Sequence, residues 1–188
     1  MSQVLVRPKV LLWDRAILFM ALTVIAMVAS SRMALYLPFT SVPITMQVFV
    51  VVLSGLLLGS GASVAQACFW VVLGSGGMIA ASGISGPGAL FGPTGGYLIA
   101  FPFATLAIGI ISERSKSPAS MILASAVGLL IIYTLGAIWL SFFVHGLGKA
   151  VTFGVLPFVL ADIAKCALAI AIASPYRIKL HRWLEGGA

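Results

Sequence analysis

The chain has 188 residues, of which 61% are hydrophobic and only 8% charged, and its mean hydropathy is +1.17. These values exclude an ordinary soluble domain and indicate an all-α integral membrane protein. The net charge of +7 does not indicate a nucleic-acid partner, because the basic residues flank apolar runs instead of following one face of a soluble helix. We expect a single transmembrane domain over residues 1–188.

Six apolar runs approach the length of about 20 residues that a membrane-spanning helix needs. The predicted spans are Ala16–Ala34, Ile44–Leu58, Ala62–Ala81, Gly95–Ile111, Ala119–Phe143 and Gly154–Ala173. The first run is not followed by a small-residue cleavage site and a soluble chain, so we expect a span and not a signal peptide. The second and fourth runs are short, which predicts irregular or tilted backbone at membrane depth.

Basic residues indicate the orientation, because cytoplasmic loops carry an excess of Lys and Arg. With six spans, one side carries Arg7, Lys9, Arg15, Arg114, Lys116, Arg177, Lys179 and Arg182. The other side has only Arg32 and Lys149 nearby. We therefore predict that both termini lie in the cytoplasm.

Turn-forming residues separate the runs. Pro38–Pro43 predicts a tight outside loop, Gly59–Gly61 a tight inside turn, and Ser112–Pro118 a polar inside loop.

Small residues recur at helix-packing spacing in two places. One is the pair Gly55 and Gly59, and the other is the series Ala26, Ser30 and Ala34 in the first span. Such spacing is typical of close contact with a partner helix, and equally of ordinary packing within one chain.

The connection Ser82–Gly96 is rich in Gly and Pro but carries no charge. A loop exposed to bulk water is usually more polar, so we expect this segment to fold back onto the bundle and line a cavity. Irregular backbone is tolerated at membrane depth only where protein or water satisfies its polar groups. The alternative is a flexible outside linker.

Asp162 and Lys165 are opposite charges three residues apart within the last apolar run. A charged side chain near the bilayer centre costs about 2.5–3.5 kcal/mol, so such residues usually face the protein interior and mark a functional site. Pro157 suits the first turn of a helix, which would place Asp162 about 8 Å along it. The pair is either an internal ion pair that fixes helix register or the polar wall of a ligand pocket.

Other chemistry has little support. The segment Gly83–Gly86 resembles the Gly-x-Ser-Gly of an intramembrane protease. That chemistry needs a histidine base on another membrane helix, but His145 and His181 lie outside the predicted spans. The sequence also contains no phosphate-binding loop. A proton relay lacks a second carboxylate or a histidine in the predicted spans to which Asp162 could pass the proton. Cys68 and Cys166 fall in apolar runs as packing residues, and we expect no catalytic residue, metal or cofactor.

Three motifs together resemble the BioY family, namely Pro43–Gln47, Gly92–Tyr97 and Asp162–Lys165. BioY proteins are the biotin-specific substrate-binding subunits of energy-coupling-factor (ECF) transporters. The resemblance implies a six-helix bundle of the ECF S-component type in the bacterial cytoplasmic (inner) membrane. It also implies assembly with a transmembrane coupling protein and two ABC-type ATPases.

The resemblance assigns the biotin head group to Asp162 and Lys165. In that family an asparagine near the start of the third outside loop also contacts the ligand, but this chain contains no asparagine, and Ser82 is the nearest polar substitute. The further residues assigned to the substrate site are Gln47, Tyr97, Phe91 and Tyr36. The aromatic ones among them, with Phe39, lie near the outside loops and would wall the ligand, or form an interfacial belt.

Small residues on the first helix form the coupling surface of the family, which implies that role for Ala26, Ser30 and Ala34. The leading hypothesis is a membrane-embedded biotin-binding subunit of a vitamin uptake system. The alternatives are a related subunit for another vitamin, or a facilitator, channel or intramembrane enzyme that acts without ATPase partners.

Overall fold

The computed structural model describes the backbone of residues 10–76, 86–115 and 117–184 and, within these, the side chains of residues 17–177. The elements are α1 (Val10–Arg32), β1 (Ala34–Leu35), β2 (Ile44–Thr45), α2 (Gln47–Ser75), α3 (Pro87–Phe91), α4 (Gly95–Arg114), α5 (Pro118–Val144), α6 (Leu147–Gly154) and α7 (Val159–Leu184). Within these described residues, four helices are long and apolar enough to cross a membrane, namely α2, α4, α5 and the Val159–Arg177 part of α7, and α1 contains the shorter apolar stretch Ile17–Arg32. The predicted class, an all-α membrane protein, agrees with these secondary-structure elements apart from the two short strands.

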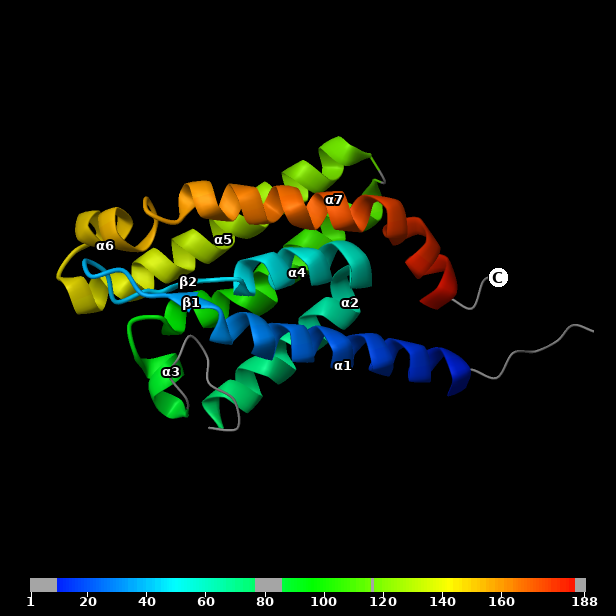
Figure 1. Ribbon diagram of the computed structural model, residues 1–188, viewed down its shortest axis with the longest axis horizontal. Coiled ribbons are helices and arrows are strands. Elements are labelled where there is room, and N and C mark those ends of the chain that lie inside the picture. The colour runs from blue at the N-terminus through cyan, green and yellow to red at the C-terminus, as the bar shows by residue number, and fades with distance from the viewer. Residues whose placement is uncertain (1–9, 77–85, 116, 185–188) are drawn as a thin grey trace, which may run out of the picture.

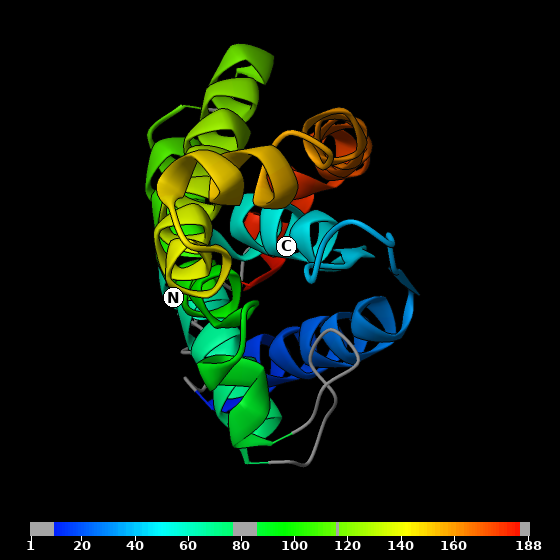
Figure 2. The same cartoon turned by 90° about the vertical axis from the view of Figure 1, so that its left-hand side faces the viewer.

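The long helices lie roughly along one axis (Figure 1). α1 and α7 are on opposite sides in this view, and α4 packs extensively against both α2 and α5. Figure 2 shows the first part of α2 between α1 and α7. The start of α1 and the end of α7 lie at one end of the bundle, whereas the strands, α3 and α6 lie at the other end.

α2 is two helical arms joined at Gly59, so the turn predicted at Gly59–Gly61 is present. The Gly59 backbone has φ 74° and ψ −176°, a conformation that is essentially restricted to glycine. Figure 1 shows the chain turning back on itself within α2. Glu113 of α4 accepts hydrogen bonds from the Ser60 backbone N–H (2.6 Å) and hydroxyl (3.1 Å), and so caps the second arm. The two glycines of the Gly55–Gly59 pair therefore have different roles. Gly59 forms the turn, whereas Gly55 lies against Ile108 of α4.

Three features at the opposite end differ from the expected spans. Ile44 and Thr45 pair with Leu35 and Ala34, so the helix predicted from Ile44 begins only at Gln47. This extended start agrees with the expectation of irregular backbone in a short span. The helix predicted from Gly154 is interrupted, because α6 ends there and a turn over residues 155–158 precedes α7. Pro157 lies in this turn and not in the first helical turn, which puts Asp162 only about 4–5 Å from the start of α7.

The uncharged connection is partly visible, since residues 77–85 lie outside the described part. Its second half forms α3 and the turn into α4, with Ala89 and Thr94 buried. The Trp139 indole of α5 donates a 2.9 Å hydrogen bond to the Gly92 carbonyl and holds this turn against the bundle. For residues 86–96 the segment therefore folds back as predicted.

Candidate functional site

Asp162 and Lys165 form a buried ion pair at the start of α7. The Lys165 ammonium donates to the Asp162 Oδ1 at 2.7 Å, and the two residues are only 8% and 3% exposed. Asp162 lies in the first turn of the helix, where the helix dipole favours a negative charge. Phe158, Asp162 and Lys165 follow at helical spacing, so α7 and the residue before it present one face with an aromatic ring, a carboxylate and an ammonium.

A third polar group completes this cluster. The Tyr133 hydroxyl of α5 donates to the other carboxylate oxygen of Asp162, Oδ2, at 2.7 Å. The two carboxylate oxygens are thus bonded to side chains of two helices, α7 and α5, which fixes the orientation of the carboxylate. Tyr133 was not among the predicted site residues. The sequence feature that could have indicated it is a side chain with a hydroxyl group in the middle of an apolar run.

The cluster has bonding capacity left over. An ammonium carries three N–H donors, and among the described residues Asp162 is the hydrogen-bond partner of Lys165. Each carboxylate oxygen can accept a second hydrogen bond. The arrangement can therefore bind a neutral polar group that presents N–H donors beside a carbonyl oxygen.

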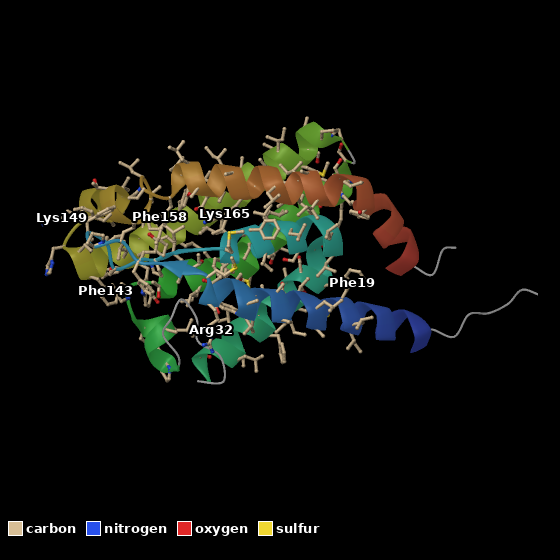
Figure 3. All side chains as sticks on the ribbon, in the orientation of Figure 1. Phe19, Arg32, Phe143, Lys149, Phe158 and Lys165 are labelled. Carbon is tan, nitrogen blue, oxygen red and sulfur yellow. The ribbon has the colours of Figure 1, made fainter. Side chains whose placement is uncertain are left out.

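The cluster opens into a cavity of about 50 Å³ between the first arm of α2, α4, α5 and α7. Its lining consists of Val42, Pro43, Thr45, Gln47, Val48, Thr94, Tyr97, Leu98, Phe101, Ile132, Tyr133, Gly154, Phe158, Asp162 and Lys165. Apolar and aromatic side chains thus surround a few converging polar groups, which is the lining of a small-molecule site, but the volume is well below the roughly 300–1,000 Å³ of ligand pockets, so a ligand with two rings must widen the cavity as it binds. Figure 3 shows Lys165 inside the bundle and Lys149 projecting at the end that carries α6, with Phe158 between them.

Two further predicted residues line the cavity. Gln47 is buried at the start of α2, and its side-chain oxygen accepts a 3.0 Å hydrogen bond from the Thr45 hydroxyl. The Tyr97 hydroxyl donates to the Gly154 carbonyl at 2.8 Å, and its ring lies against Gly136, where a Cβ would approach within 2.2 Å. Tyr97 therefore also holds α4 against α5 and the end of α6.

The remaining predicted site residues are not brought together. Phe91 and Tyr36 are 71% and 63% exposed and do not line the cavity, which is the placement of an interfacial belt. Ser82 lies outside the described residues. In the proposed coupling surface, Ala26 is exposed, Ser30 is buried with its hydroxyl bonded to the Met27 carbonyl, and Ala34 belongs to β1. These three residues do not form one exposed helical stripe.

Comparison with known proteins gives a consistent result. The BioY family model matches residues 6–183. A probable biotin transporter BioY from Pyrococcus horikoshii is 44% identical over 133 residues, which cover 70% of this chain and 78% of the relative. The biotin transporter BioY from Thermotoga maritima is 39% identical over 138 residues, which cover 73% and 82%.

One solved structure shares the fold. It is the S-component for biotin from an ECF-type ABC transporter, with a TM-score of 0.80 and 24% sequence identity. The match covers 87% of this chain and 91% of that one. The predicted S-component-like fold is therefore confirmed.

Proposed function

The chain belongs to the BioY family, and on this premise we propose that it is the membrane-embedded biotin-binding subunit of a vitamin uptake system. The observation that carries the proposal is the buried cluster of Asp162, Lys165 and Tyr133 at the wall of an otherwise mostly apolar cavity. The family relatives are named as biotin transporters, and biotin is a compact ligand with a neutral cyclic urea at one end.

The cluster suits the ureido group chemically. The Asp162 carboxylate accepts the ureido N–H groups, because hydrogen bonds from Lys165 and Tyr133 hold it in one orientation. The remaining N–H donors of Lys165 are available to the ureido oxygen. Phe101 and Phe158 supply apolar surface for the sulfur-containing ring. A buried ion pair contributes little net stability by itself, which favours a binding role over a purely structural one.

The proposed topology has six crossings, formed by α1, the two arms of α2, α4, α5 and α7. The two chain ends of the described part lie at the same end of the bundle, which supports termini on one side. The bend within α2 and the start of α5 lie toward that end too, and the buried Arg177 of α7 donates to the Ser115 carbonyl at 3.3 Å. We place this end in the cytoplasm of a bacterial cell, following the basic residues.

Active uptake requires partners in this proposal. The chain has no phosphate-binding loop, so ATP hydrolysis is assigned to two ABC-type ATPases joined through a transmembrane coupling protein. The likeness of fold to an ECF S-component supports this assembly. Ala26 is an exposed residue of α1 available to such a partner, whereas the buried Ser30 is not.

Mass spectrometry of ligand released from the detergent-purified protein tests the proposed function. We expect biotin in the denatured extract of wild-type protein from biotin-fed cells, and its loss in the Asp162→Asn variant. The Ser141→Ala variant is the matched control, because Ser141 is a half-buried polar residue that bonds its own helix and does not line the cavity. A different vitamin in the extract would instead identify a subunit of other specificity.

A further inference from the structure

α6 crosses the end of the bundle instead of following its axis. The chain leaves α5 through His145, with φ 57° and ψ 57°, and Gly146, with φ 131° and ψ 148°. Two successive positive φ values redirect the backbone sharply. Figure 2 looks onto this end of the bundle and shows α6 from the side, whereas α7 is seen along its axis. Because α7 spans the membrane in the proposed topology, α6 lies close to the membrane plane.

One half of α6 is apolar, and only part of this half packs against protein. Ala150 and Gly154 are buried against the bundle. Leu147 and Val151 lie one helical turn apart beside this buried strip, and they are 55% and 37% exposed. The exposed pair is therefore an apolar edge that the described part of the chain does not cover.

The opposite half of α6 is polar. Lys149 and Thr152 lie there, three residues apart, and both are exposed. Figure 3 shows Lys149 projecting beyond the end of the bundle. The salt bridge among the described residues joins Lys165 to Asp162, so within this part of the chain no carboxylate pairs with the Lys149 ammonium. The helix is thus amphipathic, with an unpaired cation on its polar half.

The residues before α6 also have the character of a membrane interface. Phe142 and Phe143, in the last turn of α5, are 77% and 42% exposed. Aromatic side chains are enriched where spanning helices meet the membrane surface. α6 therefore begins directly after a helix end that suits the level of the lipid headgroups.

We infer that α6 is an interfacial helix that docks on the phospholipids at this end of the bundle. Leu147 and Val151 face the acyl chains, and the Lys149 ammonium binds lipid phosphate, the counter-ion that the protein does not supply. In water the apolar edge would stay exposed, which the hydrophobic effect disfavours. The inference concerns the membrane, so it does not depend on which ligand the cavity binds.

Docking of α6 has a consequence for the cavity. Gly154 ends α6 and lines the cavity, and its carbonyl accepts a 2.8 Å hydrogen bond from the Tyr97 hydroxyl. A Cβ at Gly154 would come within 2.3 Å of that hydroxyl, so the two elements are in close contact. A lipid-docked α6 therefore holds one wall of the cavity at a fixed depth in the membrane.

Spin labelling of the full chain in liposomes of phosphatidylethanolamine and phosphatidylglycerol tests the inference. With Cys68 and Cys166 replaced by alanine, nitroxides are attached to Val151→Cys or Thr152→Cys. Power saturation compares their access to oxygen, which concentrates in hydrocarbon, and to a water-soluble nickel chelate. The label at 151 should prefer oxygen and the label at 152 nickel. Leu130→Cys, at a 65% exposed position within α5, is the control for a lipid-facing site and should prefer oxygen.

Substitutions at Lys149 test the phosphate contact. Lys149→Glu introduces a carboxylate that lipid phosphates repel, so the label at 151 should lose its preference for oxygen. Lys149→Arg keeps the charge and should keep the preference. An unchanged preference in Lys149→Glu would overturn the role of Lys149.

Three labelling patterns would overturn the docking itself. Preference for nickel at both 151 and 152 would place α6 in water, and preference for oxygen at both would immerse it in hydrocarbon. Access of neither reagent at 151 would show that another protein surface, such as a second copy of the chain, covers the apolar edge.

Discussion

Tyr133 and Lys165 each hold one oxygen of the Asp162 carboxylate, so a ligand bound at the proposed site would meet a carboxylate that is already oriented. Such preorganisation reduces the ordering that binding must impose. It also keeps a charged acceptor inside the bundle, where an uncompensated carboxylate would be strongly disfavoured. The three side chains act as one unit, and a change to any of them alters the other two.

Tyr133→Phe tests this unit. The variant leaves the ring in place but removes the donor to Oδ2, so we expect biotin affinity to fall about tenfold or more, in line with the loss of a hydrogen bond to a charged group. Tyr176→Phe is the matched control, since Tyr176 is an exposed residue of α7 far from the cavity lining. An unchanged affinity in calorimetric titration of folded Tyr133→Phe would contradict the role assigned to this hydroxyl.

The ion pair makes a separate prediction about stability. Lys165→Leu alone leaves the buried Asp162 charge uncompensated and should destabilise the ligand-free protein by about 3–5 kcal/mol. The double variant Asp162→Leu/Lys165→Leu should be more stable than Lys165→Leu, because no unpaired charge remains. Thermal unfolding in detergent measures the difference. A double variant less stable than Lys165→Leu would contradict the cost assigned to the unpaired Asp162 charge.

At the scale of the element, the turn at Gly59 determines how α2 divides into two arms. A side chain at φ 74° and ψ −176° costs about 1–3 kcal/mol. We therefore expect Gly59→Ala to lower the thermal stability of the purified protein. Gly61→Ala is the matched control, because a Cβ at Gly61 meets nothing within 4 Å. Equal melting temperatures for the two variants would contradict the importance of the turn.

Features that depend on a short stretch of chain could be predicted from the sequence. The Gly59 turn follows from the Gly-Ser-Gly string, and the Asp162–Lys165 pair follows from two opposite charges at helical spacing in an apolar run. The bond between Tyr133 and Asp162 joins residues 29 positions apart, so it depends on how α5 packs against α7. The strand pair and α6 were missed because they are too short for a recognisable hydrophobic period.

Across the whole molecule, the arrangement of the two ends predicts which residues meet which compartment. Arg114 at the end of α4 and Lys149 in α6 are both exposed, and α5, which follows Arg114, begins at the end of the bundle opposite to α6. In a background lacking Cys68 and Cys166, a membrane-impermeant maleimide should label Lys149→Cys in intact cells. It should label Arg114→Cys only after the cells are permeabilised. The reverse pattern would place the termini outside the cell.

Thr45 of β2 and Gly154 of α6 line the cavity, so in the proposed orientation the ligand is expected to enter from outside and be captured before any coupling to ATP hydrolysis. Binding should therefore need neither the coupling protein nor the ATPases. This separates the proposed subunit from a protein whose site forms only in the assembled complex.

Calorimetric titration of the purified, ligand-free protein with biotin tests the central proposal most directly. Wild-type protein should bind one equivalent of biotin tightly without partner proteins, and Asp162→Asn should lose most of this affinity while remaining folded. Absence of biotin binding by folded wild-type protein, or full affinity in Asp162→Asn, would contradict the account of the site given above.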